Sequence, residues 1–161
     1  MSCQYDNVLS VVALTPKGTI FRDVLTELFL LRAVMLDSAE RLTAPVGLTS
    51  ARWQILGAIE AAPAPVAHVA RGLGLTRQAV QETADAMERD GLITFIDNPD
   101  HKRARLMSTT AKARKALDYL RPRQLQFANM LGAAHSLDTL RATLDVLQKS
   151  RALIESKGTS S

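Results

Sequence analysis

The sequence is poor in cysteine and in aromatic residues. Cys3 is the single cysteine among 161 residues, and aromatic side chains make up 4% of the chain. One cysteine cannot form an intramolecular disulfide framework, and the first residues lack the cationic start of a secretory signal, so we expect a reducing cytoplasm. The one long apolar stretch, residues 28–36, is interrupted by Arg32 and is far shorter than the ~20 residues that a bilayer requires, so no membrane partner is expected.

Motifs for catalysis and for metal binding are also missing. The chain has no Gly-rich phosphate loop, no HExxH and no GxSxG, so we expect no enzyme. His68, His101 and His135 are scattered without a ligand-spaced cysteine or carboxylate cluster, and neither a metal nor a cofactor is expected. The residues around Cys3 supply no cation to activate its thiolate, which disfavours a redox role.

Residues 65–110 instead predict two short helices, a glycine stop and a basic-tipped hairpin. Four apolar residues at helical spacing indicate the first helix: Val66, Val69, Ala70 and Leu73. Gly72 and Gly74 are expected to end this helix. Leu75 is expected to enter the core, and Thr76 to cap the next helix.

The second helix and the hairpin follow from the same kind of pattern. Val80, Ala84 and Met87 share one face and should point inward, while the polar residues between them point outward. Gly91 should end the helix, because glycine accepts the left-handed conformation there. Residues 92–96 and 105–108 predict antiparallel strands, joined by a turn that ends in cations. This order is typical of a winged helix-turn-helix, which places a helix in a DNA major groove.

With these segments the chain resembles the MarR family of bacterial transcription regulators, from about Ile20 to the C-terminal helix. Residues 48–56 are similar to the family's second helix with its threonine cap, 69–75 to the turn that follows, and 87–93 to the exit from the recognition helix. The family's Asp-x-Arg and Leu-Thr-x-x-Gly are matched less well, by residues 101–103 and 109–113, although Arg103 and Thr110 are kept.

The positive charge is concentrated in one stretch. The net charge of the chain is +4, and residues 100–123 alone hold eight Lys/Arg against two Asp/Glu. A solvated face and a phosphate-facing role are both compatible with such a cluster. Beside a helix-turn-helix the second becomes the stronger interpretation, since phosphate neutralisation dominates DNA affinity.

The rest of the chain predicts apolar helices. A long first helix should end near Pro45, Thr110 should cap a helix in which Pro122 makes a kink or break, and Leu137 begins a stripe close to a heptad seam. We expect a mainly α fold with a small β-hairpin wing, and a homodimer formed through the terminal helices. The expected parts are an N-terminal arm (1–19), a dimerisation helix (20–47), the DNA-binding region (48–110), C-terminal dimerisation helices (111–156) and a flexible tail (157–161).

The winged helix-turn-helix and the resemblance together imply a dimeric repressor that binds double-stranded DNA at a pseudo-palindromic operator. Glutamine pairs with adenine and arginine with guanine, so the recognition helix is expected to read bases while basic wing residues contact phosphate or the minor groove. The candidate DNA contacts are Thr76, Arg77, Gln78, Gln81, Lys102, Arg103 and Arg105. Glu82 departs from the family, and a salt bridge to Arg77 or Arg71 and acceptance from cytosine are the two interpretations of it, the first being the blander.

The resemblance also implies a cleft in which many relatives bind a small aromatic or anionic effector. The candidate lining residues are Phe29, Arg32, Trp53 and Tyr119. Phe29 and Trp53 also fit plain core positions, whereas Arg32 in an apolar helix face requires a carboxylate or an anionic ligand. A winged-helix protein-interaction module remains the alternative function, because the recognition helix is unusually acidic.

Overall fold

The computed structural model describes residues 13–99 and 104–158, which form a mainly helical chain with a small antiparallel sheet. The helices are α1 (Pro16–Thr43), α2 (Ser50–Ile59), α3 (Val66–Leu73), α4 (Arg77–Arg89), α5 (Ala111–Gly132) and α6 (Leu137–Gly158), with a 3-10 turn η1 (Ala44–Val46) after α1. The strands are β1 (Ala64–Pro65), β2 (Ile93–Ile96) and β3 (Leu106–Thr109). The predicted fold class is therefore confirmed.

A compact lobe contains all of the core found in the described residues. The 17 buried apolar residues lie from Leu48 to Leu120, in α2, α3, α4, the sheet, the first half of α5 and the loops before α2 and after α4. We call residues 48–120 the winged lobe. Val80, Ala84 and Met87 are each 0% exposed, which confirms the predicted inward face of α4.

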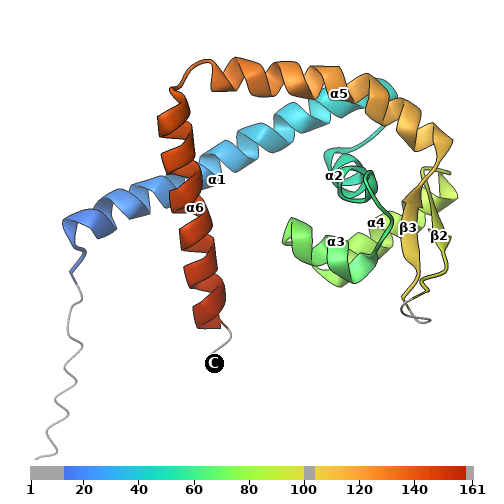
Figure 1. Ribbon diagram of the computed structural model, residues 1–161, viewed down its shortest axis with the longest axis horizontal. Helices are drawn as coiled ribbons and strands as arrows, with labels where there is room; N and C mark the ends of the chain where they lie inside the picture. The colour runs from blue at the N-terminus through green and yellow to red at the C-terminus, as the bar shows by residue number, and fades with distance from the viewer. Residues whose placement is uncertain (1–12, 100–103, 159–161) are drawn as a thin grey trace, which may run out of the picture.

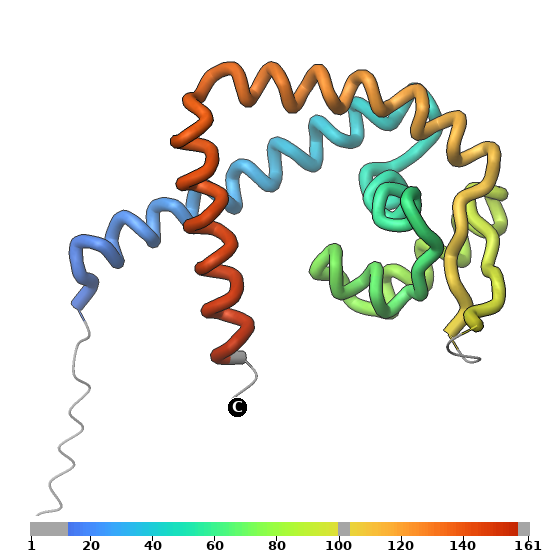
Figure 2. The backbone as a smooth tube through the Cα atoms, viewed as in Figure 1, coloured from blue at the N-terminus to red at the C-terminus, as the bar shows by residue number. Residues whose placement is uncertain are grey.

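Three long helices extend away from the winged lobe. Figures 1 and 2 show α5 running alongside α1 across the top of the molecule, with α6 descending from the end of α5 and crossing α1. We call α1, α6 and the part of α5 beyond Leu120 the helical frame. Thr43 is the one buried residue on α1, and α6 has none among its described residues. None of the helices in the described part of the chain has the length and hydropathy needed to cross a membrane.

The helix ends follow local capping chemistry. The Oγ1 atoms of Thr49, Thr76 and Thr110 accept from the backbone N–H three residues on, as N-cap side chains do. Gly74 and Gly91 adopt φ values of 64° and 67° just past α3 and α4. Leu92 N donates to Met87 O at 2.8 Å, the long-range bond of a Schellman motif, so Gly91 ends α4 as predicted.

Other local expectations were wrong. Gly72 lies inside α3 and does not break it, because Gly74 alone takes the left-handed conformation there. Leu75 is 39% exposed and does not enter the core: the Schellman bond from its N–H to Ala70 O at 2.9 Å holds it at the surface.

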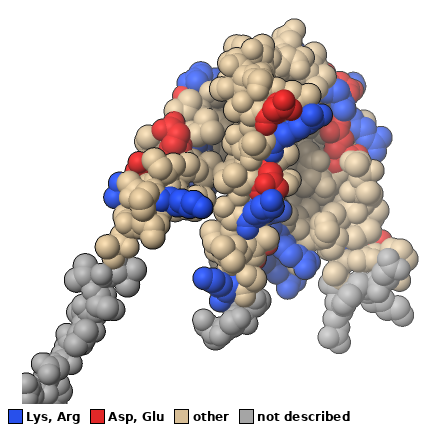
Figure 3. Space-filling view, turned by 60° about the vertical axis from the view of Figure 1, so that its left-hand side comes forward, with Lys and Arg blue, Asp and Glu red and all other residues tan. Residues whose placement is uncertain are grey.

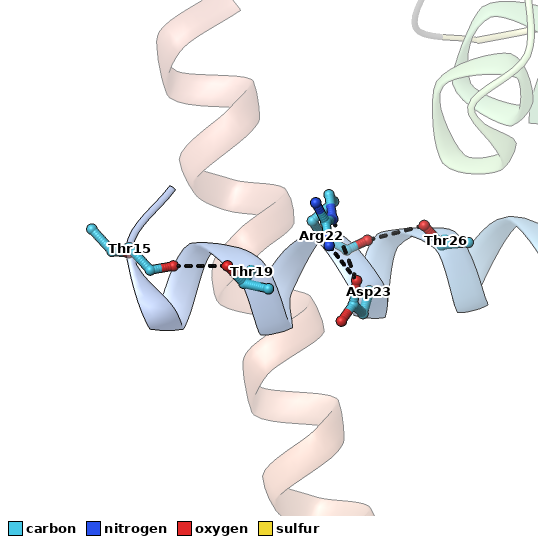
Figure 4. A network of polar contacts seen from close by, with 5 residues as sticks. All are labelled: Thr15, Thr19, Arg22, Asp23 and Thr26. Atoms are coloured by element: carbon cyan, nitrogen blue, oxygen red, sulfur yellow. Dashed lines mark hydrogen bonds and ion pairs between the residues drawn. The ribbon is translucent and has the colours of Figure 1, made fainter. Parts of the chain in front are cut away.

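The first helix starts earlier than expected. It begins at Pro16, inside the expected arm of residues 1–19, because Thr15 accepts from Gly18 N at 3.0 Å and proline suits the first helical position. The polar contacts drawn in Figure 4 stay within this helix: Thr19 donates to Thr15 O and Thr26 to Arg22 O, both at 3.2 Å. Several apolar side chains of this helix, among them Ile20 and Phe29, remain exposed.

Pro122 does not break α5. The helix continues to Gly132, although proline lacks the N–H that would bond the carbonyl of Asp118. Arg123 supports the next carbonyl, since its Nη1 donates to Tyr119 O at 2.7 Å while its guanidinium stacks 3.6 Å from the centroid of the Tyr119 ring. The Arg123 side chain thus donates to the backbone at the point where the sequence predicts that Pro122 kinks or breaks the helix.

The sheet contains one strand that the sequence did not predict. The order is β1-β3-β2, with Phe95 opposite Met107 in the expected hairpin and Ala64 opposite Met107 on the other side of β3. Strand β1 is two residues long and is defined by this tertiary pairing, not by a pattern of its own. Because β1 directly precedes α3, this pairing holds the start of α3 against the β2-β3 hairpin.

Candidate nucleic-acid interface

Helix α4 is packed into the winged lobe by one face and leaves the opposite face uncovered. Thr76 caps its start with an acceptor distance of 3.1 Å from Ala79 N, so the first turn is held firmly. Gln78 and Glu82 lie one turn apart on the exposed face, and Asp85 follows within the next turn. An exposed polar helix face beside a β-hairpin is the arrangement that a DNA groove accommodates.

A hollow of about 260 Å³ separates α4 from the wing. Arg77, Gln81, Asp85 and Glu88 line it from α4, and Phe95 and Arg105 line it from the hairpin. Arg105 does not extend freely, because its Nη2 donates to Phe95 O at 2.6 Å and its guanidinium lies 5.3 Å from the centroid of the Phe95 ring. The structure thus brings Arg77, Gln81 and Arg105 to one hollow, while Lys102 and Arg103 lie outside the described residues.

The glutamines of α4 are engaged by acidic side chains of the same helix. Gln78 Nε2 donates to Glu82 Oε1 at 3.0 Å, and Gln81 Nε2 donates to Asp85 Oδ1 at 2.7 Å. The expected salt bridge from Glu82 to Arg77 or Arg71 is not among the ion pairs of the described residues. The i,i+4 spacing of Gln78 and Glu82 brings the amide within hydrogen-bond reach of the carboxylate, so Glu82 is paired with an amide instead of a guanidinium.

The basic stretch behind the wing is largely occupied with internal contacts. Lys112 Nζ donates to Asp90 O at 2.8 Å, Arg114 donates to Thr109, and Arg121 pairs with Glu60. Arg52 and Asp90 form a further ion pair at 2.7 Å between α2 and the end of α4. The face drawn in Figure 3 accordingly shows positive and negative groups interspersed among uncharged surface.

The four candidate effector residues do not come together in one cavity. Trp53 lines a hollow of about 280 Å³ between α2 and α5, together with Gln54, Gly57, Glu60, Leu117, Arg121 and Gln124. Phe29 is 73% exposed on α1, so the core interpretation of it is wrong within one chain, and Arg32 is exposed on the same helix. Tyr119 lies outside the hollow and stacks on Arg123. Arg121 and Glu60 also line this hollow, but they were not predicted as site residues because 61 positions separate them in the sequence.

Helix, turn, second helix and β-hairpin in this order define a winged helix-turn-helix protein. The model of the MarR family matches residues 46–104. An uncharacterized protein of Mycobacterium tuberculosis, Rv2011c, is 33% identical over 126 residues, covering 78% of this chain and 88% of that protein. The chain belongs to the MarR family.

Solved structures share the fold. The transcriptional regulator MosR of M. tuberculosis, in complex with DNA, matches with a TM-score of 0.63 at 21% identity, covering 80% of this chain and 96% of that one. CouR of Rhodococcus jostii, bound to p-coumaroyl-CoA, matches with a TM-score of 0.71 at 20% identity, covering 78% and 90% of the two chains. These similarities show that the winged lobe and the helical frame together make up the fold of MarR family transcription regulators.

Proposed function

We propose that the protein is a dimeric, sequence-specific DNA-binding repressor that acts in the cytoplasm. Helix α4 enters the major groove, and the wing contacts the flanking backbone or the minor groove. The observation that carries this proposal is the uncovered polar face of α4, which is capped by Thr76 and lies beside the hairpin. The MosR structure, which contains bound DNA, supports it.

Dimerisation is supported by the apolar surface of the helical frame. Phe29, Val34, Met130 and Ile154 are each more than 60% exposed, far more than their chemistry favours in water. A second copy of the chain would cover these residues and place two α4 helices on one face. An operator read by two such helices is a pseudo-palindrome with half-sites about 34 Å apart.

An effector is supported by the hollow between α2 and α5. Its volume of about 280 Å³ suits a small aromatic acid, and it offers the Trp53 ring and the Arg121 guanidinium. The Glu60 carboxylate already pairs with Arg121, so an anionic ligand would compete for that cation. CouR, which binds p-coumaroyl-CoA in its structure, supports an aromatic effector.

Titration of salt against duplex DNA tests the proposal. Binding to genomic fragments should weaken steeply with salt, and Lys102→Ala should reduce the slope of log K against log salt by about one, the loss of one phosphate contact. Lys149→Ala is the matched control, because Lys149 lies on α6 and pairs with Asp145 at 2.8 Å. Adding aromatic acids to the same assay shows whether any of them releases the DNA.

A winged-helix protein-interaction module is the second candidate function. The acidic side chains Glu82, Asp85 and Glu88 on α4 favour it, since carboxylates repel phosphate. In that case no specific shift of any duplex appears at any salt concentration. Absence of binding to every fragment of the organism's own genome near physiological salt would disprove the regulator.

A further inference from the structure

The orientation of the two recognition glutamines is set by carboxylates. An ionised carboxylate only accepts hydrogen bonds, so the amide NH₂ group of Gln78 must face Glu82, and that of Gln81 must face Asp85. The carbonyl ends of both amides are turned away from these contacts. On the exposed face of α4, Gln78 and Glu82 therefore present the amide carbonyl, the second N–H of the amide and the carboxylate lone pairs that Gln78 does not use.

Glu82 holds the central position on that face. It is exposed, it lies one turn after Gln78 in the half of α4 that follows the cap, and its neighbours Val80 and Ala84 are buried on the opposite side. In the part of the chain that the structure describes, no lysine or arginine forms an ion pair with it. A carboxylate held by a neutral amide keeps its capacity to accept from a further donor.

We propose that Glu82 reads cytosine in each half-site and that Gln78 positions it for this contact. The inference rests on the proposed function, in which α4 lies in the major groove. The exocyclic amine of cytosine donates to a carboxylate, whereas guanine O6 and N7 and thymine O4 are acceptors. Adenine N6 also donates, but the adjacent N7 acceptor makes adenine the second choice.

The discrimination comes mainly from the penalty on wrong bases. A carboxylate placed against guanine or thymine loses water without gaining a donor, and an unsatisfied charged group is costly. The same carboxylate lies near phosphates and weakens binding to every sequence by repulsion. Glu82 thus exchanges affinity for specificity, which accounts for an acidic residue on a DNA-facing helix.

Selection of randomised duplexes on the full-length protein tests this role. The unaltered chain should enrich cytosine at one position of each half-site, by about tenfold or more over guanine and thymine. Glu82→Gln should abolish that preference and raise affinity for random duplex. Glu88→Gln is the matched control: it removes the same charge from the same helix, next to the hollow, and should raise non-specific affinity while the cytosine preference stays.

Gln78→Ala separates positioning from contact. Glu82 remains but loses its amide partner, so the cytosine preference should weaken without disappearing. Circular dichroism confirms that each variant is folded. Enrichment of the same sequence by Glu82→Gln and by the unaltered chain would overturn the inference and leave the regulator intact. If the unaltered chain enriches no sequence, both the proposed function and this inference are overturned.

Discussion

The winged lobe and the helical frame differ in how they bury apolar side chains. In the described chain, the lobe holds every buried apolar residue, and several of them, such as Leu56 and Met87, are 0% exposed. The frame is also rich in leucine and valine, yet Phe29 is 73% and Ile154 65% exposed. One region completes its core within the chain, and the other presents apolar helix faces that a single chain leaves uncovered.

This contrast separates two kinds of stability. The lobe is stabilised by burial of its own side chains, which is independent of protein concentration. In the proposed dimer the frame gains its stabilisation on association, so its contribution depends on protein concentration. Substitutions in the two regions are therefore expected to change different measured quantities.

The largest effect is expected in the lobe core. Leu56→Ala should lower the free energy of unfolding by about 2–5 kcal/mol, because it leaves a cavity at a fully buried site. Denaturant unfolding monitored by circular dichroism measures the loss. Leu75→Ala, at a leucine that is 39% exposed, should cost much less. Equal losses at the two sites would contradict the assignment of the core.

A charge on the frame should act on association instead. Phe29→Asp should raise the dissociation constant of the dimer by about 100-fold, since the carboxylate would be buried without a partner. Sedimentation velocity across a range of concentrations measures this shift. Leu75→Asp places the same charge on the lobe surface and should leave association unchanged. A dimer that tolerates Phe29→Asp would show that α1 does not form the interface.

The smallest effects concern backbone conformation within the lobe. Gly91→Ala should lower the free energy of unfolding by roughly 1–2 kcal/mol, because alanine is strained at a φ of 67°. Steric contact adds nothing to this cost, since no atom lies within 4 Å of an added Cβ. Gly72→Ala should stabilise by roughly 0.4–1 kcal/mol, since Gly72 lies inside α3 with nothing within 4 Å of an added Cβ. Thermal unfolding compares the two variants. The same sign of effect at both glycines would refute the assignment of Gly91 as the left-handed stop.

Local chemistry made most of the lobe predictable. The threonine caps and the inward face of α4 follow from residue type and spacing over a few positions, as does the Gly91 stop. Strand β1 depends on pairing with a segment about 40 residues later, and the Arg121 to Glu60 ion pair joins residues 61 apart. Contacts between residues so far apart produce no pattern among neighbouring positions, so neither contact was predicted from the sequence.

The candidate site was predictable in position but not in detail. Spacing places Gln78 and Gln81 on the polar side of α4, yet which partner each amide chooses depends on side-chain geometry. Arg105 donates to Phe95 O, a contact that its place in the predicted wing does not reveal. Competition among donors for nearby acceptors decides such details, and it is invisible in a pattern of residue types.

Helix α5 belongs to both regions, and this makes it a lever arm. Its inner turns are fixed in the core by Ala113, Leu117 and Leu120, and Lys112 ties its start to the end of α4. At ~1.5 Å per residue, its outer part extends roughly 18 Å beyond Leu120, so a tilt of about 5° at the core displaces Gly132 by roughly 1.6 Å. Ångström-scale movements in the frame therefore correspond to a tilt of α5 by a few degrees in the core. In the proposed dimer, the packing of α5 in the lobe core would therefore set the angle between the two α4 helices.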